Sequence, residues 1–165
     1  MKTLTQQLSQ YAAYHRDRRN IMTHFVGIPM IVLAAAILLA RPDFGIGGVA
    51  VSPAEIVAVA LTFYYLKLDL RYGIAMGVFL AACLAIAGEF AGTDGTIWLI
   101  WGVGLFVAGW IIQFIGHIFE GRKPAFFDDL MGLAIGPLFV MAEAGFLLGL
   151  RKEVEAEISS AAPGN

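Results

Sequence analysis

Long apolar runs, separated by short polar segments, constrain the fold of this chain more than any other feature. They cover residues 25–40, 53–66, 72–90, 96–118 and 130–150. A helix needs roughly 17–25 mostly apolar residues to cross a bilayer, so these runs predict membrane-spanning helices. Only 15% of the 165 residues are charged, against about 25% in a typical soluble domain. We therefore predict an all-α fold, a polytopic membrane helix bundle of four to five transmembrane segments.

The composition also limits domain organisation and partners. We expect a single integral membrane domain over residues 1–155 and a flexible C-terminal tail over residues 156–165. The formal net charge is −2, so the chain lacks the excess of basic residues that nucleic-acid binding requires. We expect it to be surrounded by membrane lipid. The chain has one cysteine, so an intrachain disulfide is excluded. The sequence leaves self-association into a homo-oligomer open.

The placement of lysines and arginines predicts how the helices are oriented. Counting crossings puts the basic residues of the N-terminal segment on the same side as those of two later connections; they are Lys2, Arg16, Arg18, Arg19, Lys67, Arg71, Arg122 and Lys123. Arg41 lies on the opposite side. This basic side is expected to be cytoplasmic, and the short chain suggests a bacterial inner membrane.

The last apolar run allows two topologies. Gly136-Pro137 interrupts residues 130–150, so the segment is either a kinked span or a hairpin broken or re-entrant at this dipeptide. The length of the run favours a span. A hairpin would return Arg151 and Lys152 to the basic side and strengthen the charge asymmetry. The sequence leaves the choice open.

All three histidines lie where apolar runs meet polar segments, on the expected cytoplasmic side. Gln113, His117 and Glu120 follow the spacing i, i+4, i+7, which places them in one stripe along a helix. Asn20 and His24 are likewise four residues apart. His15 is nine residues before His24, so a break near residues 18–20 is needed to turn both inward.

Three imidazoles with carboxylates nearby suit Fe(II), Zn(II) or Mn(II), with coordination positions left for substrate and for oxygen or water. We predict His15, His24 and His117 as metal ligands. Four carboxylates are candidate catalytic groups: Glu120, Asp69, Asp128 and Glu143. Four further side chains are candidates for binding substrate: Asn20, Gln113, Arg122 and Lys123.

Two long motifs resemble a known family. Residues 14–29 read YHRDRRNIMTHFVGIP, and residues 113–125 read QFIGHIFEGRKPA, followed by a Pro-Leu-Phe segment and Glu143. These segments are similar to the signatures of the 2-hydroxy fatty acid dioxygenase family, which are small multi-pass membrane proteins. The similarity extends over nearly the whole chain in the same order.

The resemblance implies Fe(II)-dependent α-oxidation, in which a 2-hydroxy fatty acid and O2 give a fatty acid one carbon shorter. The family's histidines match His15, His24 and His117. Its amides match Asn20 and Gln113, and its glutamates match Glu120 and Glu143, each as a fourth ligand or as a group that orients a ligand.

Two other classes of function remain open from the residues. A zinc-dependent membrane lipid hydrolase would use the same three ligands. A non-enzymatic membrane protein would use the histidines to bind haem or would serve in transport, although transporters place ionisable groups nearer the bilayer midplane.

Overall fold

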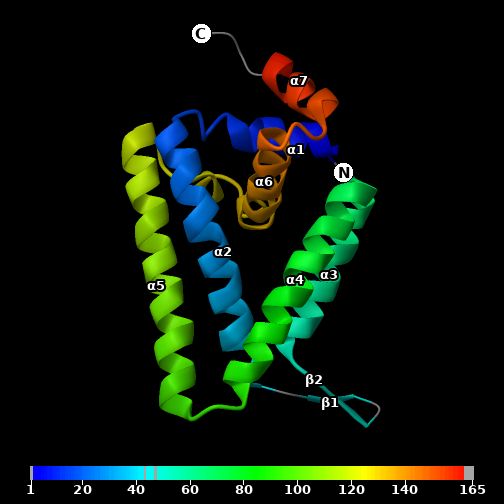
Figure 1. Ribbon diagram of the computed structural model, residues 1–165, viewed down its shortest axis with the longest axis vertical. Helices are drawn as coiled ribbons and strands as arrows, with labels where there is room; N and C mark the ends of the chain where they lie inside the picture. The colour runs from blue at the N-terminus through cyan, green and yellow to red at the C-terminus, as the bar shows by residue number, and fades with distance from the viewer. Residues whose placement is uncertain (1, 43, 47, 162–165) are drawn as a thin grey trace. The chain divides into compact units, whose positions relative to one another are not determined.

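The computed structural model describes residues 2–42, 44–46 and 48–161 of the chain. Helices dominate it, as expected, and a short β-hairpin is added (Figure 1). In chain order the elements are α1 (Leu4–Ala12), α2 (Arg18–Ala40), β1 (Phe44–Ile46), β2 (Val49–Val51), α3 (Pro53–Leu68), α4 (Leu70–Ala91), α5 (Gly95–Glu120), the 3₁₀ helix η1 (Ala125–Phe127), α6 (Gly132–Leu147) and α7 (Lys152–Ala161). Contacts divide the chain into two compact units, Met1–Ile28 with Ile112–Asn165, and Pro29–Ile111.

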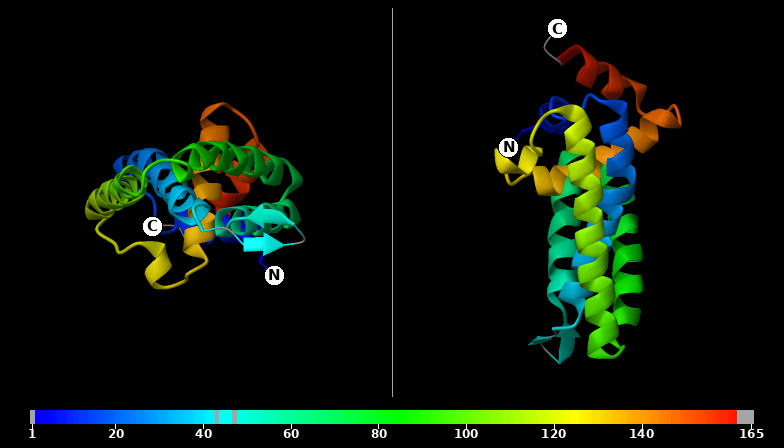
Figure 2. Two further views of the ribbon diagram at one scale, coloured as in Figure 1. Left: turned by 90° about the horizontal axis from the view of Figure 1, so that it is seen from below. Right: turned by 90° about the vertical axis from the view of Figure 1, so that its left-hand side faces the viewer.

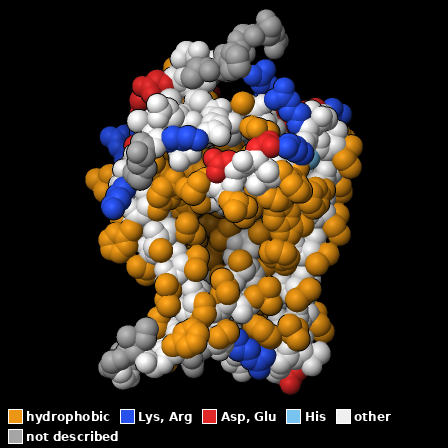
Figure 3. Space-filling view, turned by 180° about the vertical axis from the view of Figure 1, so that it is seen from behind, with side chains coloured by type: hydrophobic (Ala, Val, Ile, Leu, Met, Phe, Trp, Pro, Cys, Tyr) orange, Lys and Arg blue, Asp and Glu red, His pale blue; other side chains and the backbone are white. Residues whose placement is uncertain are grey.

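Three of the described helices are long and apolar enough to cross a membrane. They are α2 with 23 residues, α4 with 22 and α5 with 26. Only 22–28% of the residues in their apolar windows are buried inside the protein, so most of their hydrophobic surface faces outward. The face in Figure 3 shows hydrophobic side chains over most of the helical surface. Such a surface suits lipid, and the chain is an integral membrane protein.

In the unit Pro29–Ile111, α3 and α4 form a tight helical hairpin and run side by side (Figures 1 and 2). Ser52 begins α3 with a capping box to Glu55, as its sequence predicts. Asp69 alone separates the two helices, and its carboxylate caps α4 by accepting from the backbone N–H groups of Arg71 and Tyr72. A side chain at Gly73 would lie 2.6 Å from the Leu66 backbone, so the hairpin requires glycine there.

In the same unit, the end of α2 packs against the beginning of α5. A side chain at Gly102 would lie 2.5 Å from the Leu38 side chain. The Trp98 indole N–H donates to the Ile37 carbonyl at 2.7 Å. Arg41, the basic residue expected on the opposite side of the membrane, covers the Trp98 ring at 4.9 Å. These contacts join the C-terminal end of α2 to the N-terminal end of α5.

In the other unit, α1 packs against both α6 and α7. Thr3 caps α1 with a capping box to Gln6. The Thr5 hydroxyl donates to the Glu157 carboxylate at 2.8 Å and so joins α1 to α7. A side chain at Gly136 would lie 2.9 Å from the Tyr11 hydroxyl, which means that glycine lets α6 approach α1 closely.

These contacts bear on the topology of the last apolar run. Because α7 packs on α1, these two helices lie on the same side of the membrane. The 16 residues of α6 extend about 24 Å at 1.5 Å per residue, less than the roughly 30 Å of a hydrocarbon core. The short length of α6 and the packing of α7 on α1 favour a re-entrant segment over a span.

The bend does not lie where the sequence suggested. Helix α6 continues through Gly136-Pro137, and the 115° bend follows Leu147, before α7 begins. Packing of Gly136 against α1 holds this part of α6 in place although Pro137 lacks a backbone donor. Residues 156–161, the described part of the expected tail, belong to helix α7. Residues 162–165 lie outside the described part of the chain.

Candidate metal centre

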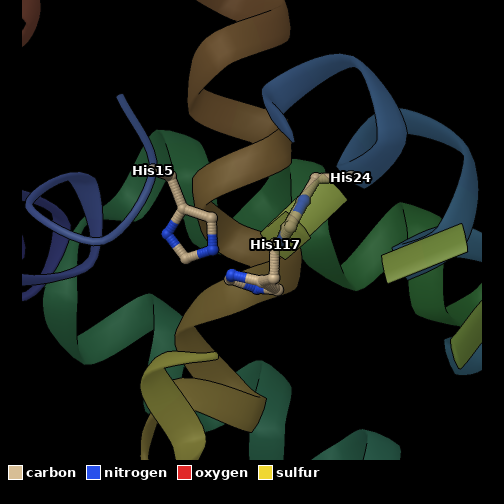
Figure 4. Close-up of side chains that lie close together, drawn as sticks. All are labelled: His15, His24 and His117. Carbon is tan, nitrogen blue, oxygen red and sulfur yellow. The ribbon is translucent and has the colours of Figure 1, made fainter. Parts of the chain in front are cut away.

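Three histidine side chains meet inside the unit formed by the two ends of the chain. His15 lies in the turn between α1 and α2, His24 in the second turn of α2, and His117 in the last turn of α5. All three are buried, with exposed fractions of 2–6%. Their candidate ligand nitrogens all lie within 4.8 Å of one another, and the side chains point toward a common centre (Figure 4). The predicted convergence is confirmed.

The break that brings His15 inward lies just before α2. Helix α1 ends at Ala12 and α2 begins at Arg18, so residues 13–17 form a turn rather than helix. His15 therefore does not share the helical register of His24, which would have placed the two on opposite sides. The Asp17 carboxylate caps α2 by accepting from the Arg19 backbone N–H at 2.8 Å.

Backbone carbonyls set which nitrogen each ring leaves free. Nδ1 of His15 lies 2.8 Å from the Tyr11 carbonyl oxygen, and Nδ1 of His24 lies 2.8 Å from the Asn20 carbonyl oxygen. A carbonyl only accepts, so each Nδ1 carries the hydrogen and donates it. In the neutral ring the Nε2 lone pair is then free to bind a metal, as in many metal sites whose histidines donate to a carbonyl.

The nitrogens that face the centre fit a metal ion. Among the described residues, His15 Nε2 and His117 Nδ1 are buried and have no hydrogen-bond partner. An unpaired buried polar group costs roughly 1–3 kcal/mol, and binding an ion would remove that cost. Ligands at about 2.1 Å from one ion are at most about 4 Å apart, so a small inward adjustment suffices. The three imidazoles are therefore a suitable donor set for a divalent transition metal.

Aromatic rings enclose His15. The Tyr11 ring stacks on it, with centroids 4.2 Å apart and planes 7° from parallel. Phe139 of α6 lies 5.7 Å from the His15 ring and 5.0 Å from the Tyr11 ring. Burial lowers the pKa of His15 from its usual value to about 4. The ring is therefore neutral near pH 7, which is the form that binds metals.

Glu120 holds the turn that carries His15. Its carboxylate accepts the backbone N–H of Arg16 at 3.0 Å and that of Asp17 at 2.8 Å. It also accepts from the Asn20 side-chain Nδ2 at 3.0 Å. These hydrogen bonds to a charged acceptor are stronger than neutral ones. Glu120 therefore joins the end of α5 to the residues that follow His15.

Gly116 allows α2 and α5 to approach beside the histidines. A Cβ atom there would lie 2.0 Å from the Thr23 hydroxyl oxygen and 2.5 Å from Asn20 Oδ1. No side chain fits such a space. Since Gly116 is next to His117 and Thr23 is next to His24, this close approach brings the two histidines together.

Comparison with known proteins agrees with the resemblance that the two motifs suggest. The family model described as "2-hydroxy-palmitic acid dioxygenase Mpo1-like" matches residues 1–147. The chain belongs to the Mpo1-like family. It is also 31% identical over 159 residues to the 2-hydroxy-palmitic acid dioxygenase MPO1 of Saccharomyces cerevisiae, which covers 94% of this chain and 87% of that protein. No solved structure matches the chain.

In this Mpo1-like protein, two amide side chains in the unit of the histidines have buried polar atoms without a hydrogen-bond partner among the described residues. Gln113 lies one helical turn before His117 on the same side of α5, and it is 4% exposed. Among the described residues, its Oε1 and Nε2 are buried without a partner, and so is Oδ1 of Asn20. Both amides were predicted from the sequence as substrate-binding groups, and both lie in the unit that holds the histidines.

The predicted basic and acidic residues after α5 lie at the surface of the same unit. The Arg122 guanidinium donates to the Ala13 carbonyl at 3.1 Å. Lys123 pairs with Asp128 at 2.5 Å, and the Tyr14 hydroxyl donates to the same carboxylate at 3.0 Å. The hydrogen bond from Lys123 lowers the pKa of Asp128 below its usual value. Asp128 is thus an ionised, paired group, which suits positioning rather than proton transfer.

The other two predicted carboxylates are placed differently. Glu143 lies on α6 and is partly buried. Asp69 belongs to the unit Pro29–Ile111, where it caps α4. The structure therefore places every predicted site residue except Asp69 in the unit of the histidines, and Asp69 caps α4 in the other unit.

Sequence reasoning missed the aromatic wall around His15. Neither Tyr11 nor Phe139 is among the candidate site residues that the sequence offers. The four-residue spacing of Tyr11 and His15 could have suggested this contact, since such a spacing brings side chains together at the end of a helix, and α1 ends at Ala12. Phe139 lies in the Pro-Leu-Phe segment of the resemblance, but nothing local indicates that it reaches His15, because the packing of α6 on α1 places it there.

Proposed function

We propose that this Mpo1-like protein is an Fe(II)-dependent dioxygenase that carries out α-oxidation of 2-hydroxy long-chain fatty acids. The acid and O2 would give a fatty acid one carbon shorter, with CO2 and water: R–CH(OH)–COOH + O2 → R–COOH + CO2 + H2O. The single observation that carries the proposal is the cluster of three buried histidines within 4.8 Å, in a family described as 2-hydroxy-palmitic acid dioxygenase Mpo1-like.

His15, His24 and His117 would hold the iron. Bound Fe(II) would supply the redox chemistry that lets O2 react with a bound organic acid. The protein's own groups prepare the ligands: the Tyr11 and Asn20 carbonyls orient two rings, and burial keeps His15 neutral. Glu120 would act by holding the His15 turn rather than as a ligand, because its oxygens already accept hydrogen bonds from Arg16, Asp17 and Asn20.

The substrate would place its polar head beside the histidines and its acyl chain among the apolar helices. Asn20 and Gln113 are the proposed contacts to the head, since their open atoms are buried. Arg122 and Lys123 would attract the carboxylate as it approaches from the surface. Asp128, Asp69 and Glu143 are proposed to contribute to the site indirectly. The hydrogen bonds that Asp128 accepts from Tyr14 and Asp69 accepts from the α4 backbone support positioning roles.

We also propose that this face is cytoplasmic. The unit of the histidines carries Lys2, Arg16, Arg18, Arg19, Arg122, Lys123, Arg151 and Lys152, eight of the chain's 11 lysines and arginines. Such an excess is typical of cytoplasmic loops. The bacterial inner membrane and self-association stay predictions from the sequence.

The decisive experiment combines metal analysis with product analysis. Protein purified without oxygen should contain about one iron per chain and, once O2 is admitted, convert 2-hydroxyhexadecanoic acid to pentadecanoic acid in mass spectrometry. Replacing His15, His24 or His117 by alanine should remove both iron and turnover. If all three variants keep full iron and full turnover, the proposed ligand set is wrong.

The same preparation distinguishes the other classes of function. Hydrolysis of a lipid ester without oxygen, retained when zinc replaces iron, would identify a zinc hydrolase. A Soret absorption band would identify a haem protein. Either result would overturn the proposed dioxygenase.

A further inference from the structure

The side-chain amide of Gln113 is buried and has no hydrogen-bond partner in the part of the chain that the structure describes. Gln113 lies in the apolar helix α5 and is 4% exposed, whereas the next two residues, Phe114 and Ile115, are exposed. Oε1 and Nε2 are both buried without a partner among the described residues. Inside a membrane little water is at hand to satisfy such groups. Such an amide is available to form hydrogen bonds with a bound ligand.

The ligand must match a donor and an acceptor that lie side by side. The NH2 group of Gln113 needs an acceptor, and its carbonyl oxygen needs a donor. A 2-hydroxy acid presents both on neighbouring carbons, because its carboxylate accepts and its hydroxyl donates. A fatty acid without the hydroxyl, or a 2-oxo acid, presents acceptors only and would leave Oε1 buried and unpaired.

The neighbourhood of Gln113 favours this residue over Asn20 as the group that recognises the hydroxyl. Asn20 uses its NH2 group to hold Glu120, so only its Oδ1 is open. Gln113 has both its NH2 donor and its carbonyl acceptor available. It lies one turn before His117 on the same side of α5. An acid head held at the histidines would lie next to it.

We propose that Gln113 is the specificity-determining residue that selects acids with a 2-hydroxyl group over acids without one. This inference rests on the proposed function, since it assigns the substrate discrimination of that site. Sites built to hydrogen-bond a hydroxyl reject analogues that lack it far more strongly than apolar pockets do, because the buried partner is left unpaired.

Equilibrium binding without oxygen tests the inference apart from turnover. Purified full-length protein in lipid nanodiscs, kept anaerobic, is titrated with 2-hydroxyhexadecanoic, hexadecanoic and 2-oxohexadecanoic acids in competition with a fluorescent fatty acid. The wild type should bind the 2-hydroxy acid at least about tenfold more tightly than the other two.

Three variants separate the contributions. Gln113→Leu, similar in size, should weaken binding of the 2-hydroxy acid by about 10- to 100-fold. Binding of hexadecanoic acid should change little, because the lost donor is offset by the removal of a stranded acceptor. Gln113→Glu should weaken every acid, since two carboxylates would meet. Gln10→Leu, at an exposed glutamine that bonds Lys2, should leave all affinities unchanged.

The outcomes distinguish this inference from the proposed function. If the wild type converts the 2-hydroxy acid but Gln113→Leu keeps the full preference for it, the inference fails and the dioxygenase stands. If the wild type neither holds iron nor turns over, the proposed function fails, whatever Gln113 selects. Circular dichroism checks folding, and Gln113→Met replaces Gln113→Leu if the latter does not fold, with the same preference loss expected.

Discussion

The Glu120 carboxylate accepts a hydrogen bond from Nδ2 of Asn20 at 3.0 Å, which joins the last turn of α5 to the first turn of α2. The same carboxylate accepts from the backbone of Arg16 and Asp17, the two residues that follow His15. One side chain therefore connects the helices that carry His24 and His117 and also holds the turn that carries His15.

Replacing Glu120 by glutamine should weaken metal binding without unfolding the helices. The amide's NH2 group would oppose the backbone donors of the turn, so His15 would be held less firmly. Loss of a group that orients a ligand typically costs about 10- to 100-fold in metal affinity. Titration of the metal-free protein with Fe(II) or Co(II) measures this. Glu157→Gln, which alters the contact between α7 and Thr5, is the matched control, and equal affinities in both variants would contradict the role of Glu120.

Gly116→Ala should separate α2 from α5. The added methyl group would overlap Thr23 Oγ1 and Asn20 Oδ1, and such overpacking costs typically about 1–3 kcal/mol. Both the thermal unfolding temperature and the bound metal should fall. Gly104→Ala on the same helix meets nothing within 4 Å and should change neither. A Gly116→Ala protein as stable and as metal-loaded as the wild type would argue against this close approach.

Tyr11→Leu should destabilise the protein and reduce metal affinity several-fold, whereas Tyr11→Phe should keep the affinity. Leucine removes the ring that stacks on His15 at 4.2 Å and leaves unfilled space, a change that costs about 1–3 kcal/mol in a packed interior. Phenylalanine keeps the ring, and the carbonyl that orients His15 belongs to the backbone in both variants. Thermal unfolding and Co(II) titration report the two effects; similar behaviour of both variants would show that the stacking has no role.

The re-entrant α6 predicts on which side the chain's end is accessible. In a background with Cys83 replaced by alanine, cysteines substituted for Lys2 and for Ser160 should react with an impermeant thiol reagent from one side of sealed vesicles. A cysteine substituted for Asp94 should react from the other, because it precedes the spanning helix α5. Labelling of the Ser160 site together with the Asp94 site would mean that α6 spans after all.

The stability of the metal-free protein should fall as the pH drops from about 6.5 to about 4. Burial lowers the pKa of His15 to about 4 in the folded state, against about 6.5 when unfolded. Between these values the unfolded chain binds more protons, so each pH unit removes up to about 1.4 kcal/mol of unfolding free energy. The slope should be smaller in His15→Gln, measured by denaturant unfolding in detergent. Identical slopes in the two proteins would show that His15 is not kept neutral.

Much of the fold could be predicted because local patterns specify it. Runs of apolar residues predicted α2, α4 and α5, and the run over residues 53–66 predicted α3. The four-residue spacings of Asn20 with His24 and of Gln113 with His117 predicted shared helix faces. The need for a break between His15 and His24 was also foreseen, a little later in the chain than residues 13–17, where it lies.

The sequence by itself determined that this chain enters a membrane with three histidines at helix ends, since hydropathy and helical periodicity are properties of neighbouring residues. Only the tertiary structure decided that Glu120 binds the His15 turn, that Phe139 reaches the His15 ring, and that α7 packs on α1. Glu120 accepts from backbone N–H groups, which every residue but proline carries, and α6 is placed by packing on α1. Contacts of these kinds leave no pattern in the sequence. Their partners are far apart along the chain, and many other backbone groups and apolar side chains could make the same contacts.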